Sequence, residues 1–277
     1  MLLSEIWIYP VKSLGGVRLP VAEVQQQGLK NDRRWLVVDE NGVFLTQRTN
    51  KQMAMIDVML HHHGVGLFDR FEPANQTIVP FTAISNEPLK VKIWKDEVLA
   101  FSVSDEADDW LSARLDRKVR IVEMRENTMR RMNPEDSENG ELLSFADDFP
   151  FHLTSEASLA DLNNKLQNPV EMKRFRPNFV ISGTSPFEED LWNYIKIGTL
   201  TFRVESPCER CVMTTIDTIS GSKTSEPLKT LSKYRKVGNK ILFGQNVIGL
   251  ESGMIKEGDE VKILRTGDAD TENGKNQ

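Results

Sequence analysis

Short stretches rich in β-branched and aromatic residues, separated by turn residues, dominate the first hundred positions. This pattern predicts short strands at residues 2–11, 21–25, 35–39, 43–45, 56–60, 64–68, 76–80, 90–93 and 98–102. The pair Asn41-Gly42 lies between two apolar runs and is the strongest short-range signal for a β-hairpin. Regularly spaced short strands of this kind are typical of a barrel or a sandwich.

Helix signals appear first at Ser104, which is followed by acidic residues and predicts a helix that reaches about Leu115. A strand at 119–123 and a long polar segment at 125–149 follow, and a loop of that length is functional or mobile. Ser155 predicts the cap of a second helix, whose N-terminus is a natural place for an anion.

The last third of the chain again indicates strands. They are predicted at residues 179–182, 194–198, 200–205 and 261–264. The polar end, 266–277, is rich in Gly, Asp and Asn, and we expect it to be disordered. The pattern as a whole predicts a mainly β fold with some α-helix.

Composition narrows the class of protein. The 277 residues are 39% hydrophobic and 27% charged, which is ordinary for a soluble globular protein. A net charge of −6 argues against a general nucleic-acid binder, and no apolar run approaches the ~18 residues needed to span a membrane. The first residues lack the features of a signal peptide. Two cysteines and ten methionines fit a reducing compartment, so we expect a cytoplasmic location.

Arginines nevertheless gather in short motifs that predict a local basic pocket. These motifs are Asp32-Arg33-Arg34-Trp35, Arg130-Arg131 and Arg174-Phe175-Arg176-Pro177-Asn178. Solvated surface charge is the alternative for each of them, and Arg34 is expected at the surface.

The two cysteines, Cys208 and Cys211, are three residues apart and lack the usual partners of a Cys-x-x-Cys pair. A structural zinc site needs four ligands, and His61-His62-His63 alternates faces on a strand, which suits a surface turn or edge better than a metal. The segment after Cys211 is β-branched and predicts a strand rather than the helix of a thioredoxin-like site. A buried inert pair and one thiolate on a metal held by other ligands both remain open.

Several segments, taken in order, resemble the MOSC family, named for molybdenum-cofactor sulfurase C-terminal domains. They are similar to bacterial YcbX-like proteins and to the mitochondrial amidoxime-reducing component. The matching segments are Tyr9-Pro10-Val11-Lys12-Ser13, Asp32-Arg33-Arg34-Trp35-Leu36-Val37, 155–163, Phe175-Arg176-Pro177-Asn178, Cys208-Glu209-Arg210-Cys211, Thr214-Thr215-Ile216-Asp217 and Leu242-Phe243-Gly244-Gln245-Asn246. The resemblance implies an N-terminal β-barrel-like domain at 1–103 and a MOSC β-barrel domain with peripheral helices at 104–265.

The resemblance also implies a molybdenum cofactor, in which a pterin carries a dithiolene and a phosphate. By this resemblance Cys211 is the molybdenum ligand, and Glu209 replaces a small polar residue of the family. The implied cofactor pocket consists of Lys12, Ser13, Arg33, Ser155, Arg176, Asn178 and Arg210, which are types that bind phosphate. Arg48 and Arg131 are possible further contacts. Asp217 would supply or relay protons, or would simply cap a turn.

The activity implied is the reduction of N-hydroxylated small molecules such as amidoximes and hydroxylamines. Some relatives append a plant-type [2Fe–2S] domain with four further cysteines. This sequence has none, so electrons are expected from a separate ferredoxin-, flavodoxin- or cytochrome-type donor.

Two alternatives remain. The chain would be a carrier of molybdenum cofactor or of its sulfur, without turnover of its own. Alternatively, it would bind another phosphorylated ligand such as pyridoxal phosphate through Lys12, which leaves the cysteine motif without a role.

Overall fold

The largest sheet takes its strands from both ends of the chain. The computed structural model describes residues 1–82 and 84–266, and its architecture is mainly β, as the sequence predicts. The predicted disordered end lies outside the described residues, apart from residue 266. The nine strands of the sheet are β1 (Leu2–Ile8), β2 (Val17–Arg18), β14 (Phe151–Ser155), β15 (Phe179–Ser182), β16 (Trp192–Ile197), β17 (Leu200–Glu209), β18 (Lys236–Val237), β19 (Lys240–Gly249) and β21 (Val261–Thr266).

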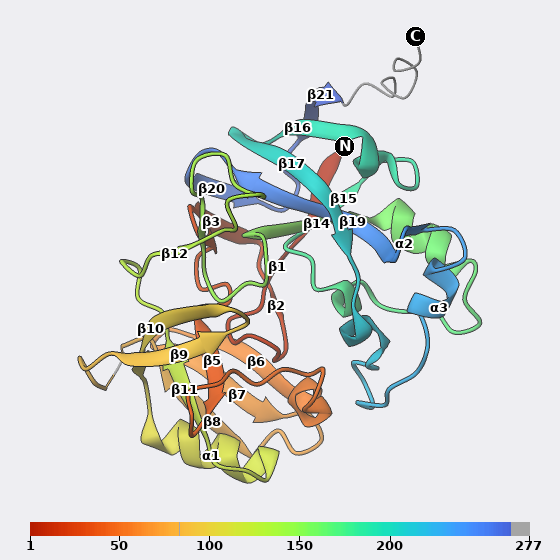
Figure 1. The fold of residues 1–277 in the computed structure, drawn as a ribbon. Helices are drawn as coiled ribbons and strands as arrows, with labels where there is room; N and C mark the ends of the chain where they lie inside the picture. Colours follow the sequence, from red (N-terminus) through yellow and green to blue (C-terminus); the bar gives the residue numbers. More distant parts are fainter. Residues whose placement is uncertain (83, 267–277) are drawn as a thin grey trace.

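Two strand pairings join the N-terminal segment to the C-terminal part of the chain, one in this sheet and one in a smaller sheet. β1 pairs antiparallel with β15, which itself runs parallel to β14. A smaller sheet contains β3 (Val21–Gln25), β4 (Gly28–Leu29) and β20 (Gly253–Lys256), with β20 antiparallel to β3. Side chains from β1, β3, β15, β17 and β19 share one hydrophobic core. The first thirty residues are therefore part of the same body as the end of the chain, as the red and blue ribbons of Figure 1 show.

The middle of the first half forms a second lobe, seen in orange and yellow in Figure 1. One sheet has the order β5 (Trp35–Asp39), β11 (Val119–Glu123), β10 (Asp96–Ser102), β9 (Leu89–Ile93), and another has the order β6 (Ile56–His61), β7 (Gly64–Asp69), β8 (Gln76–Pro80). The short 3-10 helix η1 (Lys51–Met55) belongs to this part. Two further cores lie within the second lobe. The strand pair β12 (Arg130–Arg131) and β13 (Leu142–Leu143) follows it in the chain and packs against Ile248 of β19.

Helix α1 (Asp105–Leu115) packs with the strands of this second lobe. The Ser104 hydroxyl caps it as predicted and accepts a hydrogen bond from the Ala107 amide at 3.1 Å. The helix contacts β8 and β11, and β11 in turn pairs with β5 and β10. The predicted domain boundary between residues 103 and 104 stays a prediction. The packing places α1 and β11 together with the strands that precede that boundary.

The predicted turn at Asn41-Gly42 forms. The Asp39 amide donates to the Val43 carbonyl at 2.9 Å, and the Asp39 carboxylate accepts from the Asn41 and Val43 amides. Gly42 has φ +74°, and a Cβ there would lie 2.8 Å from a backbone oxygen, so a residue with a side chain would be strained. The residues after this turn make isolated bridges rather than a full strand.

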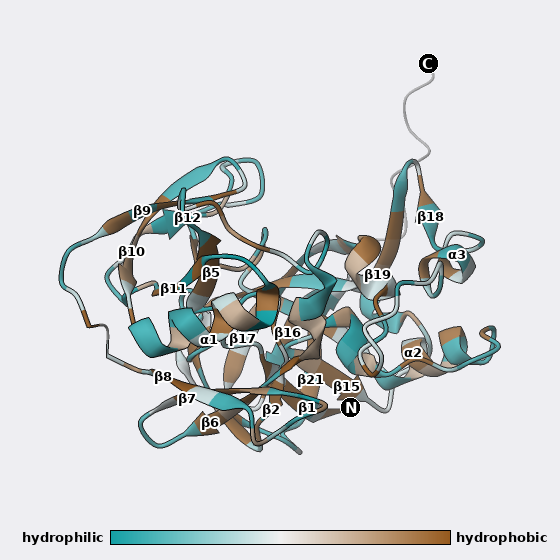
Figure 2. Cartoon of the chain, turned by 90° about the horizontal axis from the view of Figure 1, so that it is seen from below, coloured by the Kyte–Doolittle hydropathy of each residue, from teal (hydrophilic) through white to brown (hydrophobic). Residues whose placement is uncertain are grey.

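The remaining helices cover the C-terminal body. They are α2 (Glu156–Asn163), α3 (Leu228–Leu231) and the 3-10 helices η2 (Met172–Phe175), η3 (Glu188–Leu191) and η4 (Val212–Thr215). Figure 2 shows hydrophobic colour concentrated along the strands and hydrophilic colour along the loops. In the part of the chain that the structure describes, none of the helices combines the length and apolarity that a membrane span requires.

Ser155 begins α2 and also binds a buried carboxylate. Its hydroxyl accepts from the Ser158 amide at 3.1 Å and donates to Glu189 at 2.9 Å. The Ser158 hydroxyl donates to the other oxygen of Glu189 at 2.7 Å. Because Glu189 is fully buried, both hydroxyls are needed to offset its lost hydration.

We expect Ser155→Ala to lower the free energy of unfolding by about 2 kcal/mol, because it removes a helix cap and one hydrogen bond to a buried carboxylate. Urea denaturation measures this change. The exposed Ser225→Ala is the matched control and should change stability by less than about 0.5 kcal/mol. Equal effects of the two substitutions would contradict the structural role of Ser155.

Candidate active site

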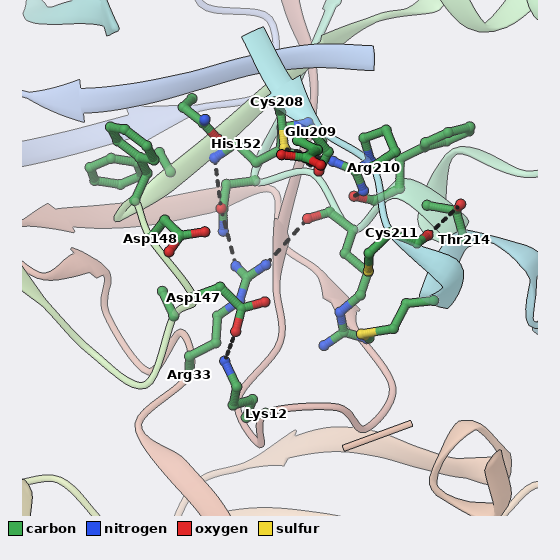
Figure 3. A pocket seen from close by; sticks show the side chains of 18 of the residues that line it. Lys12, Arg33, Asp147, Asp148, His152, Cys208, Glu209, Arg210, Cys211 and Thr214 are labelled. Atoms are coloured by element: carbon green, nitrogen blue, oxygen red, sulfur yellow. Dashed lines mark hydrogen bonds and ion pairs between the residues drawn. The ribbon is translucent and has the colours of Figure 1, made fainter. Parts of the chain in front are cut away.

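A cavity of about 360 Å³ lies where the loop after β1, the loop before β14 and the end of β17 meet. This volume is in the range of small-molecule sites, roughly 300–1,000 Å³. Figure 3 shows side chains from these three segments pointing into one space. Seven of the predicted site residues line it: Lys12, Ser13, Arg33, Arg176, Asn178, Arg210 and Cys211.

Positive charge predominates along the cavity wall. The cations are Lys12, Arg33, Arg48, Arg174, Arg176 and Arg210, and the carboxylates are Asp147, Asp148 and Glu209. Arg176 and Arg210 make no ion pair with a carboxylate within the described ranges, 1–82 and 84–266. The Nε atom of Arg210 is buried without a hydrogen-bond partner in the same residues. Such a lining favours an anionic ligand.

Arg33 is held by two buried neighbours. Its Nη1 lies 2.5 Å from Asp32 and 3.1 Å from the Asn178 side-chain oxygen. The Asn178 amide nitrogen donates to Asp32 and to the Trp7 carbonyl, each at 3.1 Å. Asn178 was predicted to bind the ligand itself, but its side-chain atoms are engaged within the protein, so its visible role is to orient Arg33.

The guanidinium groups of Arg33 and Arg176 both lie against the Tyr9 ring, 4.6 and 4.0 Å from its centroid. Arg176 donates to the Leu14 carbonyl at 2.6 Å. Burial lowers the pKa of Arg176 to about 10, and the charge of Arg33 adds to this effect. Two like charges are thus kept close together by an aromatic ring and a backbone oxygen.

The backbone is strained at residues whose side chains line the cavity. Ser13, Arg33 and Arg176 have φ values of +68°, +50° and +53°. Residues with a side chain seldom adopt this left-handed region, and each such residue costs about 1–3 kcal/mol. Strain of this kind collects at functional sites because the surrounding structure holds it in place.

Lys12 is buried and forms an ion pair. Its Nζ lies 2.5 Å from Asp147 and donates to the Phe145 carbonyl at 2.7 Å. Burial lowers the pKa of Lys12 to about 8, although Asp147 acts in the opposite direction. An ammonium group has three donors, so one remains for a ligand. Arg48, which the sequence offered as a possible further contact, binds the other oxygen of Asp147 at 3.2 Å.

The two cysteines have different surroundings. Arg210 Nη1 lies 3.0 Å from the Cys208 sulfur and 3.2 Å from His152 Nε2. Burial raises the pKa of the Cys208 thiol, and Arg210 only partly offsets this. Burial, and then the charge of Arg210, lowers the pKa of His152 well below its usual value, so the ring is neutral and accepts from Arg210. Cys208 therefore keeps its proton near pH 7.

Cys211 precedes η4, where the predicted strand is wrong. The Thr214 hydroxyl donates to the Cys211 carbonyl at 3.0 Å, and the Thr215 hydroxyl donates to the Val212 carbonyl at 2.7 Å. These local side-chain hydrogen bonds stabilise helical turns, which the β-propensity of the residues does not predict. Cys211 contributes to the cavity wall together with Met213 and Thr214, and Figure 3 shows it near Thr214.

Two predicted site residues lie outside the cavity lining. Ser155 faces Glu189 under helix α2, as described above. Asp217 closes a surface turn through the Ser220 amide at 2.7 Å and pairs with Arg174. The capping alternative that the sequence left open for Asp217 matches this geometry.

Several lining residues were missed. Asp147 and Asp148 come from the long loop at 125–149, whose length was the only available signal. His152 is distant from the cysteines in sequence, and the pairing of β14 with β19 and of β19 with β17 brings it to them. Arg34, expected at the surface, is buried and donates to Gln27 and to the Met124 carbonyl.

Comparison with known proteins adds independent evidence. Residues 1–118 match the MOSC N-terminal beta barrel domain, and residues 140–262 match the MOSC domain. The chain is 33% identical to mitochondrial amidoxime reducing component 2 of Bos taurus, over 84% of this chain and 72% of that protein. It is 32% identical to mitochondrial amidoxime-reducing component 1 of Homo sapiens, over 95% of this chain and 82% of that protein.

A third relative is larger. The chain is 30% identical to the molybdenum cofactor sulfurase of Bombyx mori, over 88% of this chain and 31% of that protein. The first domain match covers most of the second lobe together with the N-terminal strands β1 to β4, and the second domain match covers most of the C-terminal body. The chain belongs to the MOSC family and combines a MOSC N-terminal beta barrel domain with a MOSC domain.

Proposed function

We propose that this protein is a molybdenum-cofactor-dependent reductase of N-hydroxylated compounds that receives electrons from a separate donor. The observation that carries the proposal is the position of the Cys211 side chain in a cavity lined by six cationic side chains. A soft thiolate suits a molybdenum-type ion, and the cations suit an anionic organic cofactor.

The cavity chemistry fits the cofactor that the family relationship implies. Cys211 would hold the metal, and Lys12, Arg33 and Arg176 would bind the cofactor phosphate. The unpartnered Nε of Arg210 would donate to the same ligand. Within residues 1–82 and 84–266 no set of three His, Cys, Asp or Glu side chains converges on a metal position. A metal whose other ligands come from the cofactor needs only one thiolate from the protein.

When bound, the cofactor would supply two-electron reduction at its metal. The protein would supply the site around it. Burial raises the pKa of the Cys208 thiol, so Cys208 is less suited to bind a metal as a thiolate. His152, as a neutral acceptor, holds Arg210 beside the cysteine motif without adding charge. The strained backbone at Arg33 and Arg176 fixes two cations before the ligand arrives.

The relatives support the substrate class, since they are named as amidoxime-reducing components. The donor would be a ferredoxin-, flavodoxin- or cytochrome-type protein. A cytoplasmic location, where thiols remain reduced, stays a prediction.

The relationship to a molybdenum cofactor sulfurase favours a second candidate function, a carrier of the cofactor or of its sulfur. A carrier would show persulfide on a cysteine and little reduction of N-hydroxylated compounds with artificial donors. The pyridoxal phosphate alternative assigns nothing to Cys211.

The first test is Cys211→Ala in protein expressed in a host that makes molybdopterin. We expect the loss of bound molybdenum and at least a hundredfold loss of benzamidoxime reduction with reduced viologen, because the only proposed protein ligand is gone. Metal analysis and steady-state kinetics measure these changes. Cys208→Ala should keep its molybdenum, which separates the two thiols. Full activity in Cys211→Ala would exclude the ligand assignment.

The second test is the pH dependence of anion binding. Lys12, with a pKa of about 8, is mostly protonated at pH 7 and mostly neutral at pH 9, so its attraction for an anion falls over this window. We expect the dissociation constant of inorganic phosphate to rise about tenfold across it, measured by titration calorimetry.

The matched control for this test is Lys12→Arg, whose charge persists at pH 9. Its phosphate affinity should change much less, and the ionisation of phosphate itself is common to both proteins. Identical pH profiles for the two proteins would contradict a role of Lys12 in anion binding.

A further inference from the structure

A strongly basic segment, residues 223–240, follows the cysteine motif in the chain. It holds six of the 35 lysines and arginines and one of the 41 acidic residues, so its net charge is +5. The other residues, with 29 basic and 40 acidic side chains, have a net charge of −11. A local reversal of charge on an otherwise acidic protein favours the approach of an acidic partner to that one place.

The lysines of this segment form an exposed surface, which we call the basic surface. Lys240 lies 3.7 Å from Glu209, and the other lysines of the segment make no ion pair with any residue that the structure describes. Arg235, in contrast, is partly buried and pairs with Asp190 at 2.6 Å. Free ammonium groups on one short segment repel one another, and an acidic partner would relieve this repulsion. The basic surface consists of Lys223, Lys229, Lys233, Lys236 and Lys240.

Backbone hydrogen bonds connect the basic surface to the cysteine motif. β18 pairs with the start of β19 through Lys236 and Ile241. The Ile241 carbonyl accepts from the Arg210 amide at 2.7 Å, and Arg210 precedes Cys211 in the chain. Two strand spacings, roughly 10 Å, therefore separate the backbone of Lys236 from that of Arg210. A partner bound to the basic surface would lie close to the proposed metal ligand.

Helix α3 extends the basic surface beside the same motif. It contacts both β19 and η4, the helix that begins directly after Cys211. Lys229 and Lys233 are four residues apart on α3 and the helical turn after it, so their side chains lie on one face. Figure 2 shows β18 and α3 together at one end of the molecule.

The β18–β19 hairpin lies at the rim of the cofactor cavity. Val237 pairs with Lys240, so both side chains point to the same face of the hairpin. Lys240 contacts Glu209, which lines the cavity. Glu209, which replaces a small polar residue of the family, thus has a partner on the basic surface. Val237 is 66% exposed and adds an apolar contact among the lysines, and an apolar centre with a polar rim is the usual anatomy of an interface.

The place and the size of this surface favour a small electron carrier over other acidic partners. Reduction of one N-hydroxyl group consumes two electrons and two protons and releases water, so a carrier must reach the cofactor in every turnover. Transient redox complexes need only a small interface, less than about 1,200 Å². A membrane or a nucleic acid is an extended polyanion and would face the acidic remainder of the chain as well as the lysines.

We propose that the basic surface is the docking site of an acidic electron-carrier protein, which is oxidised there as it reduces the cofactor. A one-electron carrier would dock twice, and a two-electron carrier once, for each N–O bond that is reduced. Acidic side chains around the carrier's redox group would meet the lysines, and Val237 would lie within the contact. This inference rests on the proposed function and identifies the surface at which its electron donor binds.

The test measures the affinity of the purified protein for three acidic carriers: a plant-type [2Fe–2S] ferredoxin, a flavodoxin and the soluble domain of an acidic cytochrome. At least one should bind, and more weakly at about 0.15 M salt than at about 0.01 M, because the Debye length falls from about 30 Å to about 8 Å. The double variant Lys233→Glu/Lys236→Glu should weaken this binding at least about tenfold at low salt. Titration calorimetry measures these dissociation constants.

The matched control is Lys118→Glu/Lys256→Glu, which changes the net charge equally at two exposed lysines that lie outside the basic surface and do not line the cofactor cavity. Its affinity for the carrier should fall less than about twofold. Equal losses in the two double variants, or no carrier bound by the wild type at low salt, would overturn the proposal. Phosphatidylserine vesicles are titrated in parallel, and a loss of vesicle binding without a loss of carrier binding in Lys233→Glu/Lys236→Glu would also overturn it.

Kinetics with the molybdenum-loaded protein separate this inference from the proposed function. Reduced viologen is a small donor that needs no docking surface. The ratio of carrier-supported to viologen-supported benzamidoxime reduction should fall in Lys233→Glu/Lys236→Glu and stay constant in the control. If the wild type reduces nothing with viologen while a carrier binds as described, the proposed function fails and the docking surface stands. If viologen supports reduction but the charge reversal changes neither carrier binding nor this ratio, the docking surface fails and the proposed function stands.

Discussion

Buried positive charge around one cavity is the constraint on which the site depends. Moving a cation out of water is costly unless an anion or several acceptors replace its hydration. Asp32 does this for Arg33, and Asp147 does it for Lys12. Among the residues that the structure describes, Arg176 contacts only a backbone oxygen and an aromatic ring, and burial lowers its pKa to about 10. The protein therefore holds a cationic pocket that an anionic ligand would stabilise.

The fold keeps these charges together by pairing strands from the two ends of the chain. The pairing of β1 with β15 places the loop that carries Lys12 and Ser13 next to the segment that carries Arg176. The pairing of β14 with β19, and of β19 with β17, brings His152 to the cysteine motif. A one-residue shift in any of these pairings would turn the side chains of these segments away from the cavity, since side chains alternate along a strand.

Local signals were enough to predict most strands, the cap at Ser104 and the turn at Asn41-Gly42, because neighbouring residues determine these features. The recognisable motifs also pointed to the residues that line the cavity. They did not reveal that Ser155 turns toward Glu189, since a helix cap looks the same in sequence whichever way its hydroxyl faces. Asp147 and Asp148 lie in a loop, and only the folded chain brings them to the cavity wall.

The central claim is that Cys211 is the protein ligand of a molybdenum centre in this cavity. X-ray absorption at the molybdenum edge tests it directly, because the spectrum reports the number of sulfur atoms bound to the metal. In the Cys211→Ser protein, whose hydroxyl can keep the metal in place through oxygen, we predict one sulfur neighbour fewer than in the wild type. The same number of sulfur neighbours in both proteins would contradict it.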